Sequence, residues 1–266
     1  MALPDFLIAG APKAGTTALH TALAAHPGLF MSAVKEPKFF LTDGPPPRRG
    51  GPGDAQTYRE HIWRRADYEA LFATAPAGSL RGESTPFYLY DRDAQRRIRA
   101  LIPAARLIVI LRDPVERAHS NWTHLWSAGL EPIGDFPAAC AAEDSRVAAG
   151  WAPFWHYTRL GRYGEQLDHL LGLFPREQVF LLRYRDLVDA PAQTLDGTKA
   201  GRQGHLDTHL ELRSMSLVLH TGQRAQGPAG QHNTFPKREQ TDLVLRRHKK
   251  AARRIRKIPR RFEEQR

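Results

Sequence analysis

The residues best suited to chemistry form a Gly-rich segment near the beginning of the chain. Residues 10–17 read Gly-Ala-Pro-Lys-Ala-Gly-Thr-Thr and lie between a strand-like run and a helix-like run. Glycine lets a backbone approach an anion closely, and the first turn of a helix presents N–H groups that lack intrahelical partners. Lys13 adds a mobile positive charge. The segment is therefore predicted to bind a phosphate or sulfate group.

The spacing of Gly10 and Gly15 equals that of a Walker A loop, but the residue types differ. In a Walker A loop a lysine follows the second glycine. Here Thr16 follows it, and the lysine lies inside the loop at position 13. This displacement argues against an ordinary ATPase or GTPase. A nucleotide-dependent kinase or other phosphotransferase, and an incidental strand–turn–helix junction, are the alternatives.

A second candidate anion site lies at Arg112 and Ser120. Asp113 and Pro114 form a sequence typical of the beginning of a helix, so Ser120 falls about two helical turns after Arg112, near enough to share one anion with it. The planar fork of arginine suits phosphate because it can bind two oxygens. The alternative for Arg112 is a surface ion pair with Asp113 or Glu116.

Apolar patterning indicates the elements that must position these segments. Strands are expected at 3–11, 29–34, 80–84, 106–111 and 179–182, and helices at 15–25, 91–101, 114–127 and 163–174. The continuous apolar run within 106–111 is typical of a strand that is buried on both faces. The alternation predicts an α/β fold with a central parallel sheet flanked by helices.

The formal net charge of +11 is unevenly distributed. From Lys237 to the end, thirteen Lys and Arg face four Asp and Glu, which leaves only +2 for residues 1–236. The body of the protein therefore has no general basic field, and specific nucleic-acid binding is not expected. Peripheral contact with an acidic membrane surface through the basic tail, or nucleic-acid binding there, is the alternative function.

Composition narrows the class further. Cys140 is the single cysteine, which excludes an internal disulfide framework and a cysteine-based zinc site, and no convincing set of metal ligands is found. Neither a membrane-spanning run nor a signal-peptide pattern is recognised, so a cytoplasmic enzyme is expected.

Taken together, the two anion-binding segments resemble a known family. Residues 9–19 are similar to the 5′-phosphosulfate-binding loop, and residues 111–120 to the 3′-phosphate-binding segment, of sulfotransferases that use 3′-phosphoadenosine 5′-phosphosulfate (PAPS). Residues 35–40, Lys-Glu-Pro-Lys-Phe-Phe, and 82–86, Gly-Glu-Ser-Thr-Pro, are similar to the carbohydrate (heparan-sulfate-type) and bacterial branch. The resemblance covers about residues 4–195 and implies a three-layer, P-loop-like fold.

The resemblance also implies roles for individual residues. Donor-binding positions are Gly10, Pro12, Lys13, Ala14, Gly15, Thr16, Thr17, Arg112 and Ser120. Lys13 is expected to contact the transferring group and the departing oxygen, so it is also a catalytic candidate. PAPS is the implied sulfuryl donor, and no metal is required.

The general base is expected to be a glutamate. Glu36 matches the base of the carbohydrate-type members because it lies just before Phe39 and Phe40, and Glu83 is the second choice. The alternative for Glu36 is a structural ion pair with Lys35 or Lys38. Geometry decides which carboxylate reaches the acceptor.

The acceptor is expected to be a small molecule or glycan that offers a hydroxyl or amine: a carbohydrate, a glycolipid or a natural product. Lys35, Glu83 and Tyr163 are candidates for contacting it. His119 and His124 are assigned core or surface roles. Several aromatic residues suit either an acceptor site or simple packing: Trp122, Trp126, Trp151, Phe154 and Trp155.

The family resemblance ends near residue 195. We therefore predict a sulfotransferase domain at 1–195 and an atypical basic region at 196–266. Gly, Gln, His and Arg dominate after Gly197, and this shift predicts a region that is altered relative to the family or poorly ordered. A change of reading frame in a GC-rich gene is one explanation for such a composition.

Overall fold

Five parallel strands form the central sheet of the computed structural model, which describes residues 2–194. They are β1 (Phe6–Gly10), β2 (Leu29–Met31), β3 (Leu80–Ser84), β4 (Arg106–Leu111) and β5 (Val179–Arg183), in the spatial order β2-β3-β1-β4-β5. Every residue of β1 is buried, as is every residue of β4 except Arg106. Parallel strands require such cover on both faces because their crossover helices pack there.

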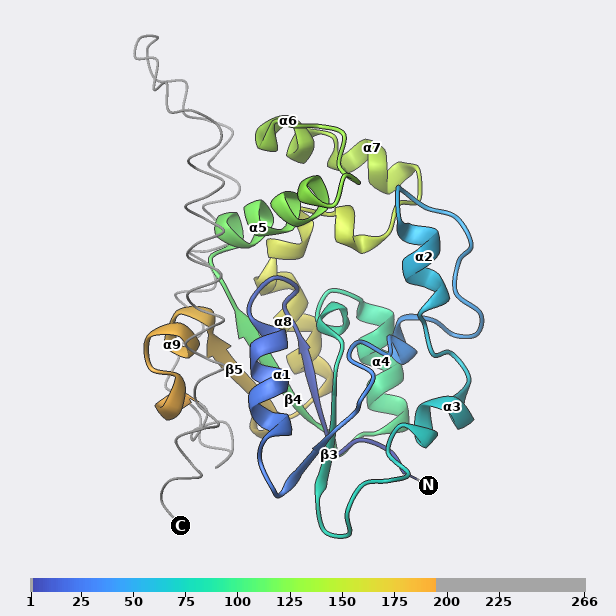
Figure 1. The fold of residues 1–266 in the computed structure, drawn as a ribbon, viewed down its shortest axis with the longest axis vertical. Helices are drawn as coiled ribbons and strands as arrows, with labels where there is room; N and C mark the ends of the chain where they lie inside the picture. Colours follow the sequence, from blue (N-terminus) through green and yellow to red (C-terminus); the bar gives the residue numbers. More distant parts are fainter. Residues whose placement is uncertain (1, 195–266) are drawn as a thin grey trace.

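Helices cover both faces of this sheet. The longer ones are α1 (Thr16–Ala24), α4 (Arg92–Leu101), α5 (Pro114–Ser127) and α8 (Tyr163–Leu173). Right-handed crossovers place α1 on one face, and α4 and α8 together on the other (Figure 1). The shorter helices are α2 (Asp54–Arg59), α3 (Arg65–Ala70), α6 (Phe136–Ala141), α7 (Glu143–Ala148) and α9 (Tyr184–Asp189).

Local chemistry explains where the helices beside the sheet begin. The side chain of Asp113 accepts hydrogen bonds from the N–H groups of Val115 and Glu116, and Pro114 occupies the first helical position of α5. Asp91 caps α4 in the same way by accepting from the N–H of Ala94. Such caps satisfy N–H groups that a helix cannot pair internally.

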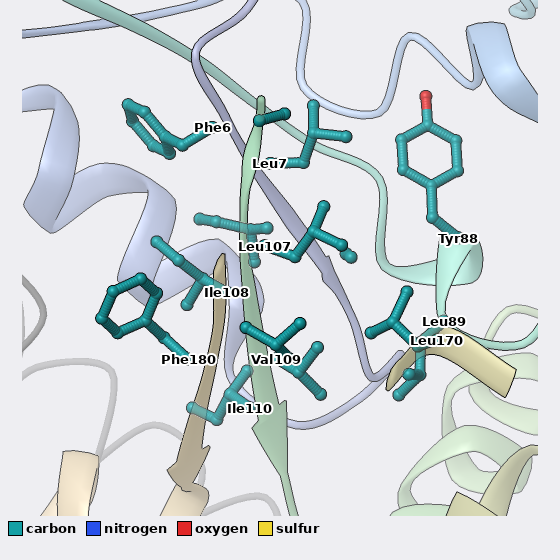
Figure 2. Close-up of a cluster of buried hydrophobic side chains, with 14 of the residues drawn as sticks. Phe6, Leu7, Tyr88, Leu89, Leu107, Ile108, Val109, Ile110, Leu170 and Phe180 are labelled. Carbon is teal, nitrogen blue, oxygen red and sulfur yellow. The ribbon is translucent and has the colours of Figure 1, made fainter. Parts of the chain in front are cut away.

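Side chains alternate between the two faces of the sheet and form the main core. Figure 2 shows Ile108 and Phe180 on one side of β4, and Val109 near Leu89 and Leu170 on the other. All five are at most 8% exposed. Residues on alternate faces of one strand are both buried here, which accounts for the unbroken apolar run in the sequence.

A second, smaller core lies beyond the carboxyl end of β4, where α5, α6 and α7 gather (Figure 1). The carboxylate of Glu131 accepts two hydrogen bonds of 2.7 Å from Arg146 and one of 2.6 Å from the hydroxyl of Tyr157. This buried ion pair is fully hydrogen-bonded, as a charge removed from water must be. The second core supports one side of the cavity described below.

The α/β fold predicted from the sequence is confirmed, with a parallel sheet flanked by helices in a P-loop-like arrangement. The expected strands and helices are all present, although β1 and β2 are shorter than expected. The short helices α2, α3, α6, α7 and α9 were not predicted, because each has only six residues and gives little periodic signal. The basic tail and its predicted disorder lie outside the described residues.

Candidate functional site

The Gly-rich loop joins the carboxyl end of β1 to the first turn of α1. Gly15 is the N-cap residue of α1 and has φ 93°, a left-handed conformation that favours glycine. A Cβ atom at Gly15 would lie 2.9 Å from a ring carbon of Tyr184. The position thus requires glycine for two reasons, and the backbone at the start of α1 stays accessible to an anion.

Gly10 has a different reason to be glycine. A Cβ atom there would lie 2.5 Å from the Cβ of Leu89, so the absence of a side chain permits β1 to pack against the segment after β3. Gly10 and Ala14 do not belong to the residues that line the cavity, and Ala14 is fully buried. Both therefore shape the loop, whereas Pro12, Lys13, Gly15, Thr16 and Thr17 border the cavity.

Lys13 lies at the centre of the loop. Its φ of 64° is uncommon for a residue with a side chain. Burial and, to a smaller extent, the nearby positive charge of Arg112 together lower the pKa of the Lys13 ammonium to about 8. A cation that is destabilised in this way gains most from an incoming anion, which would restore its protonated form.

Arg112 and Ser120 border the same cavity as Lys13, so the two segments predicted to bind anions meet in space. The Nη1 of Arg112 donates to the backbone oxygen of Lys13 at 3.3 Å, and its guanidinium lies 4.8 Å from the centre of the Tyr184 ring. The ion pair with Glu116 is also present, at 3.3 Å. Arg112 therefore makes the expected surface ion pair and still borders the cavity.

Glu36 enters the cavity from the segment that follows β2. Its backbone N–H donates to the oxygen of Ser84 at 2.9 Å, which ties it to the end of β3. Its carboxylate pairs with the ammonium of Lys35 at 2.5 Å, so the structural ion pair expected as the alternative is present as well. Glu36 lines the cavity, whereas Lys35 does not belong to its lining.

Glu83 lies in a different environment. It is fully buried, does not line the cavity, and accepts hydrogen bonds from the hydroxyls of Tyr68, Thr85 and Tyr88 at 2.8–3.1 Å. Burial raises the pKa of the Glu83 carboxyl, and the three hydrogen bonds lower it. Burial has the larger effect, so the pKa is about 7. Through these hydrogen bonds Glu83 joins β3 to α3 and to the segment after β3, which is a structural role.

Tyr163 is also placed away from the cavity lining. It is 1% exposed, and its hydroxyl donates to the backbone oxygen of Arg112 at 3.0 Å. In this position Tyr163 holds the turn that carries Arg112. A residue that acts through the donor segment fits this geometry better than one that touches an acceptor.

Sequence reasoning missed two residues of the site. Lys38 lines the cavity and pairs with Glu60 at 3.2 Å, and Tyr184 covers both Gly15 and Arg112. A signal for Lys38 was available, because it follows Glu36 by two positions. In the described part of the chain, the residues other than glycine with positive φ are Lys13, Glu36 and Lys38, and all three line the cavity. Such conformations are costly and gather at functional sites.

Some of the aromatic and histidine candidates line the cavity, and others pack away from it. Phe154 and His124 line the cavity, and their rings are 5.5 Å apart. Trp155 is 1% exposed and packs in the second core. His119 contacts Trp122 in the same region. Trp155, His119 and Trp122 therefore have packing roles. His124, in contrast, was expected to have a core or surface role and instead lines the cavity.

The cavity itself has a volume of about 1030 Å³, at the upper limit of the usual range for a ligand pocket. It opens beyond the carboxyl ends of β1, β3 and β4, where ligands bind in open α/β sheets. Donor-loop residues border one part of it, and α2, the segment after β3 and the second core border the rest. In residues 2–194 no cluster of His, Cys, Asp and Glu suited to a metal ion is found, and no helix is long and apolar enough to cross a membrane.

Comparison with known proteins places this geometry in context. The profile of the "Sulfotransferase family" matches residues 51–197, a range that includes Arg112 and Ser120. Human heparan sulfate glucosamine 3-O-sulfotransferase 6 is 31% identical over 192 residues, which cover 71% of this chain and 49% of that protein. Mouse bifunctional heparan sulfate N-deacetylase/N-sulfotransferase 3 is 29% identical over 206 residues, covering 73% and 21%. The chain spans about half the length of the first relative and less of the second.

A solved structure is similar over a larger share of its length. A sulfotransferase from Alicyclobacillus acidocaldarius is 28% identical, with a TM-score of 0.74. The match covers 84% of this chain and 93% of that one.

Proposed function

Because the chain belongs to the sulfotransferase family, we propose that it transfers the sulfuryl group of PAPS to a hydroxyl or amine of an acceptor. The observation that carries this proposal is the single cavity lined by Lys13, Arg112 and Ser120. A donor with phosphate groups at both its 5′ and 3′ positions needs two anion sites within one ligand's length. The proposed activity is assigned to residues 1–195, and the family match ends close to that boundary, at residue 197.

The residues present fit such a donor. The first turn of α1 offers backbone N–H groups, Gly15 permits close approach, and Lys13 supplies a positive charge. Arg112 and Ser120 would hold the 3′-phosphate through charge-assisted hydrogen bonds. Tyr184, stacked on the Arg112 guanidinium, and Tyr163, bonded to its backbone oxygen, hold this arginine in place.

In the proposed reaction a bond forms between the acceptor oxygen or nitrogen and sulfur, while the bond from sulfur to the bridging phosphate oxygen breaks. Lys13 neutralises the negative charge that develops on that oxygen, and adenosine 3′,5′-bisphosphate (PAP) is the second product. Glu36 accepts the proton of the acceptor. We favour it over Glu83 because Glu36 borders the cavity that Lys13 borders, whereas Glu83 is buried among three hydroxyls.

Ligand binding to the full chain tests the donor assignment. We expect PAP to bind more tightly than either adenosine 5′-monophosphate or ATP with Mg²⁺ in calorimetric titrations. Ser120→Ala should weaken PAP binding by about tenfold, the usual value of a hydrogen bond to a charged group, and leave the monophosphate unchanged. Preference for ATP would instead support the kinase alternative. If Ser120→Ala weakened the binding of PAP and of adenosine 5′-monophosphate equally, Ser120 would not belong to the 3′-phosphate site.

A further inference from the structure

The part of the cavity beyond the donor residues is apolar and aromatic. We call these residues the acceptor wall: Pro47, Pro52, Tyr58, Phe87, Leu130 and Phe154. They come from α2 and the loop before it, from the 3-10 helices η2 (Pro86–Tyr88) and η3 (Pro153–Trp155), and from the turn after α5. The rings of Phe87 and Phe154 meet edge to face, with centres 5.7 Å apart.

The acidic groups near the acceptor wall are bound to other parts of the protein. Asp54 accepts hydrogen bonds from the N–H groups of Gly51 and Ala152 and from the Trp155 ring, at 2.6–3.0 Å. Asp91 caps α4 by accepting from the N–H of Ala94 at 2.8 Å. Asp54 is therefore occupied by three internal donors, and Asp91 serves as the cap of α4.

The cationic groups of this region are similarly engaged. Among the described residues that line the cavity, the lysines and arginines are Lys13, Lys38 and Arg112, and the first and last belong to the donor site. Lys38 donates to Glu60 at 3.2 Å. Burial lowers the pKa of His61 to about 4 and also lowers the pKa of His124, so both rings are neutral at pH 7.

These observations oppose an anionic acceptor inside the cavity. A sulfate or carboxylate that is taken out of water is strongly destabilised unless a cation or several donors bind it. The acceptor wall offers instead surfaces that favour aliphatic chains and the faces of rings. Cations do occur outside the lining, at the exposed Arg48 and Arg49 of the loop between Pro47 and Pro52. A long polyanion would have to depend on such groups.

We propose that the acceptor is an uncharged amphiphilic alcohol, whose hydroxyl lies near Glu36 and Lys13 and whose apolar body packs against the acceptor wall between Tyr58 and Phe154. This inference rests on the proposed function and specifies its acceptor. It sets the chain apart from the similar proteins named for heparan sulfate, a polyanion. Specificity for such an acceptor would arise from the acceptor wall.

The experiment measures binding to the full chain saturated with PAP. The probes are octyl β-D-glucoside, kept below its critical micelle concentration, and a heparosan hexasaccharide with ionised carboxylates. We expect saturable binding of the glucoside, at least about tenfold tighter than that of the hexasaccharide. Phe154→Ala should weaken the binding of the glucoside by about tenfold, which is the usual effect of truncating a packed aromatic side chain. Arg48→Ala with Arg49→Ala is the matched control and should leave glucoside binding unchanged, because neither arginine lines the cavity.

Each contrary result identifies what has failed. Tighter binding of the hexasaccharide, no saturable binding of the glucoside, or an unchanged affinity in Phe154→Ala would overturn the acceptor proposal. PAP binding is measured first in every variant. If Phe154→Ala loses PAP binding, Tyr58→Ala replaces it, because Tyr58 lies on a separate helix. If the wild-type chain does not bind PAP, the proposed function itself fails.

Discussion

Two glutamates with the same side chain occupy opposite environments in this protein. Glu36 borders the cavity with Lys13 and pairs with Lys35, whereas Glu83 is fully buried and receives three hydroxyl hydrogen bonds. A general base must reach the proton that it removes. Access to the acceptor therefore favours Glu36, and the raised pKa of Glu83, near 7, reports its burial.

Replacing each glutamate by its amide tests this choice. Glu36→Gln should lower the transfer rate by about 10²–10⁴-fold, the usual contribution of a general base, with PAP affinity unchanged. Glu83→Gln is the matched control, because an amide resembles the protonated acid that its burial favours, and it should keep most of the activity. Single-turnover transfer from PAPS to the best acceptor of the wild-type chain gives the rates. A larger loss in Glu83→Gln would reverse the assignment.

We expect Lys13 to make PAP binding sensitive to pH. Its pKa of about 8 results from burial and from the positive charge of Arg112, so the ammonium loses its proton as the pH rises through 8. The phosphates stay fully charged above pH 7. PAP affinity should thus fall at pH 9 relative to pH 7, by up to about tenfold per pH unit above the pKa.

Lys13→Arg provides the comparison, because a guanidinium keeps its charge throughout this range. The variant should show a much flatter dependence of PAP affinity on pH, whatever its affinity at pH 7. Titrations at several pH values in one ionic strength measure both curves. Parallel curves for the two proteins would show that another group titrates.

At the scale of elements, Asp54 joins two segments that are distant in the sequence. It accepts from the N–H of Gly51 in the turn before α2, and from the Ala152 N–H and the Trp155 ring about 100 residues later. The acceptor wall depends on this junction, since Pro52 and Tyr58 lie on one segment and Phe154 on the other. Asp54 is therefore a positioning residue.

Asp54→Asn should raise the KM for the acceptor with little change in kcat or in PAP affinity. The amide cannot accept from all three donors, so we also expect a loss of stability of about 1–3 kcal/mol. Glu131→Gln is the control, because it disrupts a buried ion pair with Arg146 in the second core and does not border the cavity. If both variants lower stability and raise KM equally, the effect of Asp54→Asn is merely structural.

At the scale of the whole molecule, charge and catalytic parts lie in different regions of the chain. The tail from Lys237 carries thirteen Lys and Arg, whereas residues 1–236 have a net charge of +2. Membrane contact through this tail and a cytoplasmic location stay predictions, and the tail lies outside the described residues. The residues that we propose to bind the donor, in contrast, lie within 2–194.

Deletion of residues 237–266 should leave PAP affinity and transfer to a small, freely dissolved acceptor within about twofold of the full chain, because no site residue is removed. Adsorption to vesicles with anionic lipid should fall, since each Lys or Arg contributes about 1 kcal/mol near such a surface. Vesicle co-sedimentation and calorimetry measure the two effects. A large loss of PAP affinity would show that the tail forms part of the donor site.

The amino-acid sequence by itself determined the parallel sheet and its longer helices, and it was enough to propose the donor segments. Buried strands and helix caps are local patterns, so apolar runs and the Asp113–Pro114 pair were sufficient to find them. Residues 10–17 and 112–120 were predicted to bind anions on similarly local grounds, because each segment lies at one strand–helix junction.

Tertiary structure alone decided how these parts meet. It buried Glu83 and left Glu36 beside Lys13, turned Tyr163 toward the backbone of Arg112, and brought Tyr184 over Gly15. It also paired Lys38 with Glu60 and Asp54 with Trp155, which left the acceptor wall without a free charge among its described residues. Exposure and pairing depend on contacts between segments far apart in the chain, and no local pattern contains that information.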